Sequence, residues 1–387
     1  MKKTFSPLIF WLAGESSGDL HAALVMKALK DVLPNARHVG IGGPRMQAEG
    51  LKPLYPFKRF AVMGFVEVIK HLFFFWKVLR GIKSYMYKEK PDLCILVDYP
   101  GLNMRIANIA DHARVPVLYY ICPQFWAWKH ERVFKLKAMT RHVACILPFE
   151  EEMLNIHSIN CSFVGHPISE EIAFELNRDE FAAFWRLDKE KKWLAFFPGS
   201  RENEVKRMLD IFLDAAALFD PDEYEFLFSR ARSVDHNFYM ETIARHPKLK
   251  IHVIDGYTYE MMKYASFAVS TSGTATLECA YIGTPVAICY KANFISYLIG
   301  KHVVRIKRIG LPNIILDQDL LPELIQNELT AKNVHQVVSR HLADEERMNE
   351  IKSQLAQLQE MLSEPKPSEV MPKLILELLE RYARPAF

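Results

Sequence analysis

The sequence of 387 residues predicts an α/β protein with two doubly wound, Rossmann-like domains that face a cleft. Three observations lead to this fold class. Short, almost continuously apolar runs alternate with helical patterns, which is typical of parallel strands buried on both faces. The alternation occurs twice, on either side of a charged stretch at 170–192 that has no strand pattern. Hydrophobic residues make up 50% of the chain, enough for two cores.

The first half contains six strand candidates separated by helical patterns. Apolar residues at helical spacing fill the intervals, for example at 19–33, 103–113 and 132–139. Such repetition of strand, helix and strand makes the βαβ units of a doubly wound sheet. The strand candidates are residues 8–13, 38–41, 93–97, 117–121, 143–147 and 162–164.

The second half repeats this order. Its helical patterns cover 201–218, 236–245, 257–264 and 274–282, and from residue 320 onward we expect helices alone, the last at 365–387. These patterns place one domain at 1–170, a second at 190–345 and a helical end at 346–387. The strand candidates are residues 193–197, 224–228, 250–254, 267–270 and 285–288.

Composition excludes several classes of protein. The formal net charge is +3, from 49 basic and 46 acidic residues, so no nucleic-acid partner is expected from overall charge. The six cysteines form no C-x-x-C pair, which favours reduced thiols in the cytosol. The sequence contains no run of 18 apolar residues, so no membrane-spanning helix is expected. Pro7 interrupts the apolar N-terminal run, so we interpret 8–13 as a strand rather than a signal peptide.

In doubly wound sheets, ligands bind beyond the carboxyl ends of the strands. The first strand candidate is followed by AGESSGD at 13–19, where Gly14 and Gly18 allow close approach of a ligand and the following helix start favours an anion. The glycine spacing is not that of a dinucleotide fingerprint, so an NAD enzyme is not expected. A tight turn with Ser17 or Asp19 as helix cap explains the segment equally well.

Two further strand ends in the first half carry candidate site residues. Asp98 follows the 93–97 strand beside Pro100 and Gly101, a position where a partly desolvated carboxylate can act as a general base on a hydroxyl. A helix cap or a salt-bridged loop acid remains an alternative. CPQFWAWK at 122–129 follows the next strand, and its aromatic residues fit a pocket wall or ordinary core packing.

Two strand-to-helix turns in the second half fit a nucleoside diphosphate. In FPGSR at 197–201, backbone N–H groups and the Arg201 guanidinium suit a phosphate. In STSGTATLE at 270–278, Thr274 and Glu278 share one helix face, so a diphosphate at the helix start leaves Glu278 available to ribose hydroxyls. A Ser/Thr cap alone is the alternative for each turn.

The stretch at 62–90 is apolar, aromatic and basic. From Val66 to Lys90 it carries six Lys or Arg against two Glu. This pattern favours a helix in an anionic membrane interface over a core helix with snorkelling lysines. A second, weaker basic patch lies at 301–308. The expected membrane or acyl contacts are Val66, Ile69, Leu72, Phe73, Phe75, Trp76, Lys77 and Arg80.

Several other signatures do not occur. The histidines show no metal-ligand spacing, no D-x-D motif suggests a metal-bound nucleotide, and neither a Walker loop nor a G-x-S-x-G elbow is present. No metal and no cofactor are therefore expected. GHP at 165–167 is interpreted as a structural turn.

Ten short segments occur in a characteristic order: AGESSGD (13–19), GIGGPRMQAEG (40–50), VMGFVEV (62–68), DYPGLN (98–103), CPQFWAWK (122–129), LPFE (147–150), VGHP (164–167), FPGSRENEV (197–205), SGTATLE (272–278) and LPNII (311–315). Taken together, they resemble the lipid-A-disaccharide synthase family, glycosyltransferases of the two-Rossmann-domain (GT-B) type. Departures from the family pattern are modest: Ser16, the His21-Ala22-Ala23 run and Gly101-Leu102.

The resemblance implies transfer of diacylglucosamine from UDP-diacylglucosamine to the 6-hydroxyl of diacylglucosamine 1-phosphate. The α-linked donor and β-1,6-linked product imply inversion in one displacement, which needs a base and stabilisation of the leaving diphosphate. Fixed positive groups would replace a metal. The implied roles are Asp98 as base, Arg201 with Gly199 and Ser200 at the diphosphate, Ser272, Gly273, Thr274 and Glu278 at phosphate and ribose, Asn313 completing the site, and Glu15 and Ser17 orienting a sugar.

The family also implies a cellular setting. Both substrates carry acyl chains, so the 62–90 stretch would dock on the cytoplasmic leaflet of the inner membrane in a Gram-negative bacterium, making this a cytoplasmic, peripheral membrane protein. Homodimers are common in the family, and the last helices return to the first domain.

Two alternatives remain at the level of sequence. One alternative is another enzyme of the same fold that acts on UDP-sugars, such as a UDP-N-acetylglucosamine 2-epimerase or a peptidoglycan N-acetylglucosaminyltransferase. The aromatic segment argues against an epimerase. A catalytically inactive scaffold that binds nucleotide or membrane would keep the fold without the chemistry. The presence of both Asp98 and Arg201 favours an enzyme.

Overall fold

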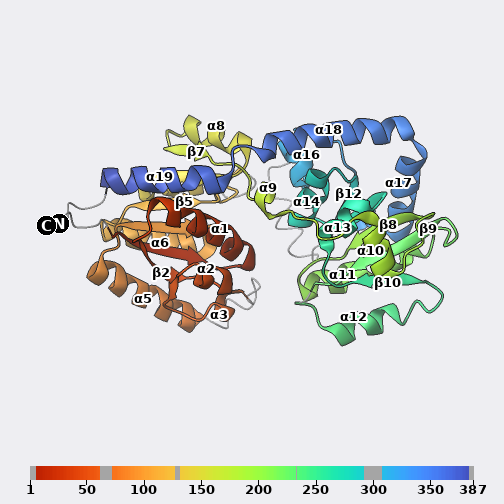
Figure 1. The fold of residues 1–387 in the computed structure, drawn as a ribbon, viewed down its shortest axis with the longest axis horizontal. Helices are drawn as coiled ribbons and strands as arrows, with labels where there is room; N and C mark the ends of the chain where they lie inside the picture. Colours follow the sequence, from red (N-terminus) through yellow and green to blue (C-terminus); the bar gives the residue numbers. More distant parts are fainter. Residues whose placement is uncertain (1–5, 62–71, 127–130, 232, 292–306, 383–387) are drawn as a thin grey trace. The chain divides into compact units, whose positions relative to one another are not determined.

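The computed structural model describes residues 6–61, 72–126, 131–231, 233–291 and 307–382. The chain forms two compact units (Figure 1). The first comprises Met1–Pro167 with Glu364–Phe387, and the second comprises Ile168–Ser363. Each is built on one parallel sheet with helices packed against it, so the predicted α/β class of two doubly wound sheets is confirmed.

The first unit contains a seven-stranded sheet in the order β3-β2-β1-β4-β5-β6-β7. Every residue of β1 is buried, as expected for a central strand of a parallel sheet covered on both faces. In register, Trp11 of β1 lies opposite Gly40 on one side and Ile95 on the other. The strands are β1 (Leu8–Ala13), β2 (Arg37–Ile41), β3 (Lys52–Pro53), β4 (Leu93–Val97), β5 (Val117–Tyr120), β6 (His142–Cys145) and β7 (Cys161–Phe163).

Two apolar layers cover the faces of this sheet, and α5 and α19 lie on opposite sides of it (Figure 1). Alternate β1 residues enter opposite layers: Phe10 lies in the layer that contains Val78 of α5, and Trp11 lies in the layer that contains Ile375 of α19. The helices of this unit are α1 (Ser16–Val32), α2 (Pro44–Ala48), α3 (Lys58–Ala61), α5 (Leu72–Glu89), α6 (Pro100–His112), α7 (Arg132–Met139), α8 (Pro148–Ile156) and α19 (Pro367–Tyr382).

The second unit has a six-stranded sheet in the order β10-β9-β8-β11-β12-β13. Its strands are β8 (Lys192–Phe197), β9 (Tyr224–Ser229), β10 (Ile251–Ile254), β11 (Phe267–Thr271), β12 (Val286–Tyr290) and β13 (Glu323–Ile325). Its helices are α9 (Ile168–Glu171), α10 (Arg178–Trp185), α11 (Glu202–Ala216), α12 (His236–Ile243), α13 (Thr258–Tyr264), α14 (Thr274–Ile282), α16 (Leu311–Ile315), the 3₁₀ turn η1 (Gln326–Glu328), α17 (Ala331–Ala343) and α18 (Glu345–Ser363).

The structure corrects three sequence-based expectations. Residues beyond 320 are not all helical, because β13 pairs with β12. The two-residue strand β3 has no apolar pattern, since both of its side chains are exposed. The helical end does not separate at residue 346: α18 packs on α14 and α17 and buries Ile351 and Leu355, so it belongs to the second unit. The last helix, α19, packs on α1 and belongs to the first unit.

Asp19 has a structural role that differs from the predicted one. It does not cap its own helix; its carboxylate accepts hydrogen bonds from the N–H groups of Gly43 (2.7 Å), Arg45 (3.1 Å) and Met46 (3.1 Å) at the start of α2. A carboxylate at a helix N-terminus satisfies otherwise unpaired donors. Asp19 thereby ties α2 to α1.

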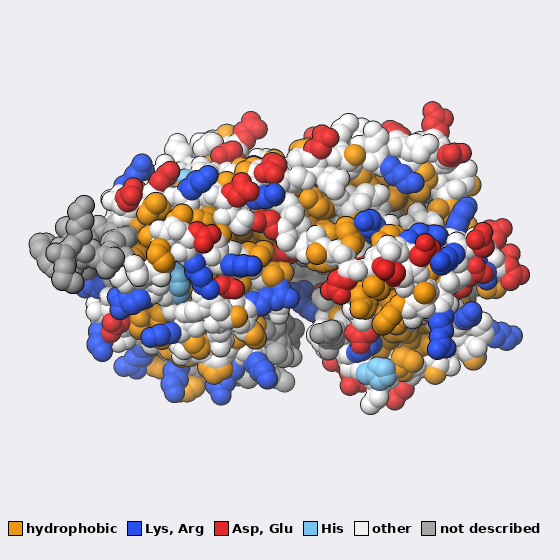
Figure 2. All heavy atoms as spheres, viewed as in Figure 1, with side chains coloured by type: hydrophobic (Ala, Val, Ile, Leu, Met, Phe, Trp, Pro, Cys, Tyr) orange, Lys and Arg blue, Asp and Glu red, His pale blue; other side chains and the backbone are white. Residues whose placement is uncertain are grey.

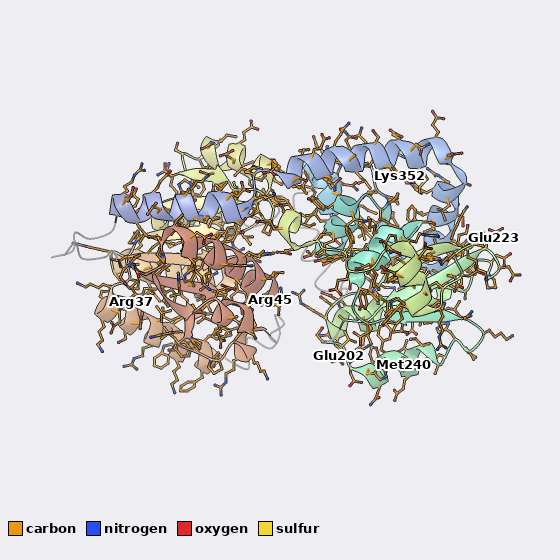
Figure 3. All side chains as sticks on the ribbon, viewed as in Figure 1. Arg37, Arg45, Glu202, Glu223, Met240 and Lys352 are labelled. Atoms are coloured by element: carbon orange, nitrogen blue, oxygen red, sulfur yellow. The ribbon has the colours of Figure 1, made fainter. Side chains whose placement is uncertain are left out.

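The two edges of each sheet can be followed in Figure 3. Arg37 begins β2 and Arg45 lies in the helix after it, so they mark the amino and carboxyl edges of the first sheet. In the second unit, Glu202 follows the carboxyl end of β8 and Glu223 precedes the amino end of β9. The candidate residues of the sequence follow the carboxyl ends.

Within the described ranges, none of the helices has the length and apolar content needed to cross a membrane.

The packing of α19 on the first sheet generates a stability prediction. Leu379 is fully buried, so Leu379→Ala should lower the free energy of unfolding by about 2–5 kcal/mol. Lys373→Ala, an exposed change in the same helix, should alter it by less than about 0.5 kcal/mol. Urea unfolding would measure both; equal effects of the two variants would contradict the docking of this helix.

Candidate functional site

The strand order in both sheets reverses at one place. In the first sheet β1 has β2 on one side and β4 on the other, and in the second sheet β8 has β9 on one side and β11 on the other. Loops after such neighbouring strands diverge to opposite faces and leave a crevice, the usual ligand position in doubly wound sheets. The loops that follow β1, β4, β8 and β11 begin at Gly14, Asp98, Pro198 and Ser272. These loops contain the candidate residues of the sequence analysis.

The loop after β4 has an unusual backbone. Asp98 and Tyr99 both adopt the left-handed conformation, with φ of 46° and 47°. This region costs a non-glycine residue about 1–2 kcal/mol, and it persists where the surrounding structure enforces it. Two consecutive residues in this conformation turn the chain sharply from β4 into α6.

Hydrogen bonds hold this turn in place. Asn103, fully buried in α6, donates from Nδ2 to the carbonyl oxygens of Val97 (3.0 Å) and Asp98 (2.6 Å). The Tyr119 hydroxyl donates to the same Asp98 oxygen at 2.8 Å. The Asp98 N–H donates to the Tyr120 carbonyl at 2.9 Å. These bonds explain how the strained turn is maintained.

The Asp98 carboxyl group has a higher pKa than an ordinary aspartate. Burial, reinforced by the nearby Glu15 carboxylate, raises the pKa of Asp98 to about 6, against the opposing effects of the Tyr99 N–H and of His21. Glu15 occupies the N-cap position of α1 and is half-buried, whereas Ser17 in the first turn is exposed. The structure thus brings Glu15 and Asp98 together, while Ser17 lies on the exposed side of the first turn of α1.

Gly14 is required by its neighbour. A Cβ atom at Gly14 would lie 2.5 Å from the Tyr99 ring, so the ring packs directly on the Gly14 backbone. Burial and the Glu15 carboxylate raise the pKa of Tyr99, which places its hydroxyl in the same electrostatic environment. The loops after β1 and β4 therefore form one packed unit.

In the second unit, the loop after β8 presents a turn rich in donors. Gly199 has φ of 121°, which only glycine adopts readily. The N–H groups of Ser200 and Arg201 donate to Glu204 Oε2, each at 3.3 Å, and Arg201 Nη1 lies 3.1 Å from Glu204 Oε1. The Arg201 side chain is 68% exposed. Glu204 thus holds the turn in place through these donors.

The loop after β11 leads directly into α14. Gly273 is its N-cap, Thr274 is exposed in its first turn, and Ser272 is half-buried. Thr276 turns its hydroxyl back onto the Gly273 carbonyl at 2.7 Å and is therefore structural. Burial and the Glu171 carboxylate raise the pKa of Glu278 to about 7, and the Tyr259 hydroxyl donates a hydrogen bond to Glu278.

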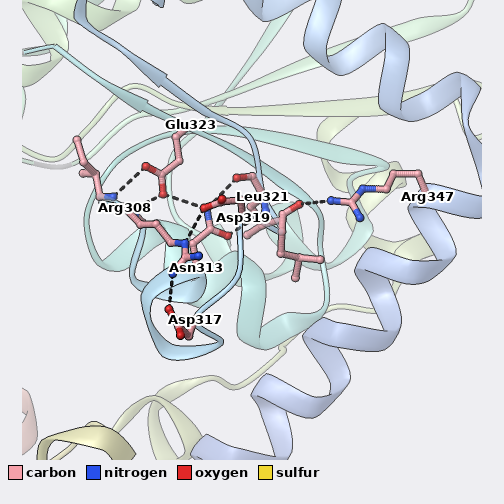
Figure 4. Close-up of polar contacts among 10 residues, drawn as sticks. Arg308, Asn313, Asp317, Asp319, Leu321, Glu323 and Arg347 are labelled. Carbon is pink, nitrogen blue, oxygen red and sulfur yellow. Dashed lines mark hydrogen bonds and ion pairs between the residues drawn. The ribbon is translucent and has the colours of Figure 1, made fainter. Parts of the chain in front are cut away.

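Asn313 is placed differently from a simple ligand. It is 1% exposed, and its Nδ2 donates to Leu321 O (2.8 Å) and Glu323 Oε1 (2.9 Å) while Oδ1 accepts from Leu321 N (2.9 Å) (Figure 4). Glu323 also accepts from the N–H groups of Ile309 and Gly310, each at 2.9 Å. Asn313 therefore braces the loop of α16, which packs on α14.

The expected membrane face is divided by the helical period. Phe73 and Trp76 are 78% and 55% exposed, and their rings stack at 6.1 Å. Lys77 and Arg80 are also exposed, and Lys and Arg gather over α5 in Figure 2. Phe75, expected on this face, is instead 8% exposed in the core, because it lies on the opposite side of the helix.

Less can be said of the three other residues that were expected on the membrane face. Val66 and Ile69 lie outside the described residues, as does most of the 301–308 basic patch. Leu72 begins α5. A hollow of about 240 Å³ lies beside the exposed face, lined by Trp76, Leu79, Arg80, Lys83 and Ile109.

Several residues of the first site were not among the expected site residues. Tyr119 and Glu150 are buried polar groups with partners 21 and 24 positions away in the chain, although Glu150 belongs to the LPFE motif. Asn103 bonds to residues five and six positions earlier and belongs to the DYPGLN motif, but it was given no role. Of the aromatic motif, Phe125 is buried in the core and Trp126 is half-buried, while Trp128 lies outside the described residues. His166 is buried.

Among the described residues, no group of three or more His, Cys, Asp or Glu side chains is arranged to hold a metal ion.

Comparisons with known proteins agree with one another. A family model described as lipid-A-disaccharide synthetase matches residues 9–376. The lipid-A-disaccharide synthase of Nitrosococcus oceani is 36% identical over 347 residues, covering 88% of this chain and 89% of that protein. Among solved structures, the calicheamicin glycosyltransferase CalG4 matches with a TM-score of 0.62 at 12% identity, covering 99% and 100% of the two chains. The UDP-GlcNAc 2-epimerase from Neisseria meningitidis bound to UDP-GlcNAc matches with a TM-score of 0.60 at 11% identity, covering 97% and 100%. These two structures share the fold.

The raised pKa of Asp98 predicts a pH-dependent effect on stability. The native state binds this proton more tightly than the unfolded chain, whose carboxyl has a pKa of 3.8, so the carboxyl group destabilises the fold as pH rises from about 4 to 6. Asp98→Asn should be more stable than the wild type by up to about 3 kcal/mol at pH 8, with no difference near pH 4. Urea unfolding at both pH values would test this, with exposed Asp31→Asn as control. A less stable Asp98→Asn at pH 8 would contradict the inferred burial.

Proposed function

The chain belongs to the lipid-A-disaccharide synthase family, and we propose that it uses Asp98 as the base and the second unit as the UDP-sugar site. Its role is lipid A disaccharide synthesis. The proposed donor is UDP-2,3-diacylglucosamine, and the proposed acceptor is 2,3-diacylglucosamine 1-phosphate. The acceptor 6-oxygen attacks C1 of the donor sugar, the bond from C1 to the diphosphate breaks, and UDP leaves. A single displacement on an α-linked donor yields the β-1,6 linkage.

The environment of Asp98 carries this proposal. A hydroxyl group must lose its proton as it attacks, and a positioned base accelerates that step about 10²- to 10⁴-fold. A carboxylate with a pKa of about 6 accepts a proton better than an ordinary aspartate yet remains ionised near neutral pH. Its strained, heavily braced turn at the carboxyl edge of the sheet is typical of functional residues. Glu15, which shares this environment, is proposed to orient the acceptor, together with Ser17.

The second unit is proposed to hold the donor. The Arg201 guanidinium and the N–H groups of the Gly199-Ser200 turn donate to Glu204 in this structure. They are proposed to exchange this carboxylate for the diphosphate and to stabilise the negative charge that develops on it as it leaves. Ser272, Gly273 and Thr274 begin α14, where backbone donors and the helix dipole favour a phosphate.

Two acidic or amide groups of this unit have distinct proposed roles. Glu278 lies one turn beyond Thr274 and is proposed to accept hydrogen bonds from the ribose hydroxyls. Asn313 has both amide hydrogens engaged within its own loop. We therefore assign it the ordering of the loop beside α14 rather than direct contact with the nucleotide.

The exposed face of α5 is proposed to dock on the cytoplasmic leaflet of the inner membrane. Phe73 and Trp76 offer apolar rings, and Lys77 and Arg80 supply positive charge. Amphipathic basic helices of this kind bind anionic bilayers. Docking would bring the enzyme to acyl-chain substrates that reside in the bilayer.

Asp98→Asn should separate catalysis from nucleotide binding. Because asparagine cannot accept the hydroxyl proton, kcat should fall about 100- to 10,000-fold, while the Kd for UDP should change less than about twofold. Isothermal titration with UDP and a transfer assay in detergent would measure the two quantities. Asp31→Asn, on the exposed surface of the same unit, should leave both unchanged. Wild-type turnover by Asp98→Asn would refute the assignment of the base.

The pH dependence of the wild type provides a second test. Asp98 must be ionised to act, so kcat/KM should rise with pH and level off above about pH 6. Glu15→Gln removes a neighbouring negative charge and should shift that rise to lower pH. Rates measured from pH 4.5 to 8 would show both effects. If kcat/KM rises over the same pH range in Glu15→Gln as in the wild type, Asp98 is not the group whose ionisation causes the rise.

Vesicle binding tests the membrane face. The Phe73→Ser/Trp76→Ser variant loses two exposed aromatic rings and should bind anionic vesicles at least about tenfold more weakly. Sedimentation with vesicles of phosphatidylethanolamine and phosphatidylglycerol would measure this, and activity in detergent should be retained. Phe184→Ser, which removes a 60% exposed ring from the second unit, should have no effect. Equal losses for both variants would contradict docking through α5.

A further inference from the structure

Glu150 is a buried acid that the proposed reaction does not use. It lies in the first turn of α8 and is 1% exposed. Its carboxylate accepts hydrogen bonds from Trp126 Nε1 (3.0 Å) and from the N–H of Leu147 (3.3 Å), both neutral donors. The bond from Leu147 closes a capping box at the start of α8, which accounts for an acid at this position. The bond from Trp126 Nε1 is not part of that cap and points to a second role, which is to hold the indole.

Trp126 is the side chain that Glu150 holds. It follows β5 in the aromatic loop, its ring meets the Phe149 ring edge-on at 5.1 Å, and it is half-buried. An indole anchored at its N–H and supported on one side by another ring has a fixed orientation. The part of the ring that remains accessible is an apolar surface at the carboxyl edge of the first sheet.

This surface lies close to the proposed base. β5 pairs with β4 and with β6, so the loops that carry Trp126, Asp98 and Glu150 follow three adjacent strands. The Asp98 N–H donates to Tyr120, the last residue of β5. Burial raises the pKa of Glu150 to about 7, with a further contribution from the Asp98 carboxylate. The two acids therefore share one buried neighbourhood.

Trp126 also lies on the membrane-proposed side of the sheet. It packs on the core layer that contains Phe75 and Val78 of α5, and the opposite layer contains α1 and α19. An acyl chain that enters from the α5 side would meet this layer first. A rigid aromatic ring next to the base suits contact with such a chain better than contact with a charged group.

We propose that Glu150 is a positioning residue that fixes the Trp126 indole as the apolar wall for an acyl chain of the acceptor, beside Asp98. This inference rests on the proposed function, because it concerns the acceptor of the same reaction. It assigns to Trp126 a part in specificity for acylated acceptors and to Glu150 a part that is exerted through Trp126.

Acceptor chain length gives the readout that a merely structural role would not change. Trp126→Phe keeps a ring but removes the N–H, and Glu150→Ala removes both carboxylate oxygens and so the acceptor of the Trp126 N–H. Each should lower kcat/KM about tenfold with the long-chain acceptor, mainly through KM, and much less with a short-chain acceptor. The double variant should lose little more than the worse single variant, because both changes release the same indole.

Matched controls separate this effect from general damage. Glu152→Ala removes an exposed acid from the same helix, and Trp193→Phe removes an indole N–H that is bonded to Asp188 O at 2.8 Å in the second unit. Neither should change discrimination between chain lengths. UDP affinity, measured by calorimetry, should be unaffected by Trp126→Phe and Glu150→Ala.

The outcomes distinguish this inference from the proposed function. If the wild type forms the disaccharide and the two variants lose activity equally with long and short chains, or additively, the inference is overturned while the proposed function stands. If the wild type forms no disaccharide from either acceptor, the proposed function itself fails. A chain-length-dependent loss that is shared by the two variants supports the inference.

Discussion

Parallel pairing of β1 with β4, strands about eighty positions apart in the chain, determines most of what the first unit can do. Because both strands run the same way, the loops after them emerge at one edge, and because their helices lie on opposite faces, the loops diverge. Gly14 and Tyr99 meet at that point, and the Asp98 turn is formed there. The pairing of β8 with β11 has the same consequence in the second unit, where it places the Arg201 turn and the start of α14 at adjacent strand ends.

Acids that are buried, as Glu150 is, or half-buried, as Asp98 and Glu278 are, lie close to strand ends and oppose stability. Burial raises the pKa values of Asp98, Glu150 and Glu278 to about 6, 7 and 7. Each carboxylate is therefore disfavoured in its ionised form by the environment that holds it. Hydrogen bonds from Trp126 to Glu150 and from Tyr259 to Glu278 offset part of this cost. The cores beneath, with fully buried β1 and β4, supply the stability that these groups reduce.

Much of the fold was predictable because buried parallel strands produce apolar runs that are visible in the sequence. The bounds of β1 and β4 match the expectation residue for residue, whereas β3 and β13 escaped because short edge strands need no apolar run. Site residues at strand ends were also predictable, since the sheet order alone brings them together. The bracing by Tyr119 and the anchoring of Trp126 by Glu150 depend on tertiary contacts, and no local pattern reveals such contacts. Asn103, by contrast, bonds to residues five and six positions earlier, and the burial of Phe75 follows the helical period of α5.

The linkage that the enzyme forms would show whether the acceptor hydroxyl displaces UDP in a single step. Purified protein would be incubated in detergent with UDP-2,3-diacylglucosamine, 2,3-diacylglucosamine 1-phosphate and excess EDTA, and the product would be examined by mass spectrometry and by NMR at the new anomeric carbon. We expect UDP in equal amount to a disaccharide 1-phosphate with a β-1,6 linkage, the product of one inverting displacement assisted by a single base. An α-linked product, or UDP released without a disaccharide, would contradict it.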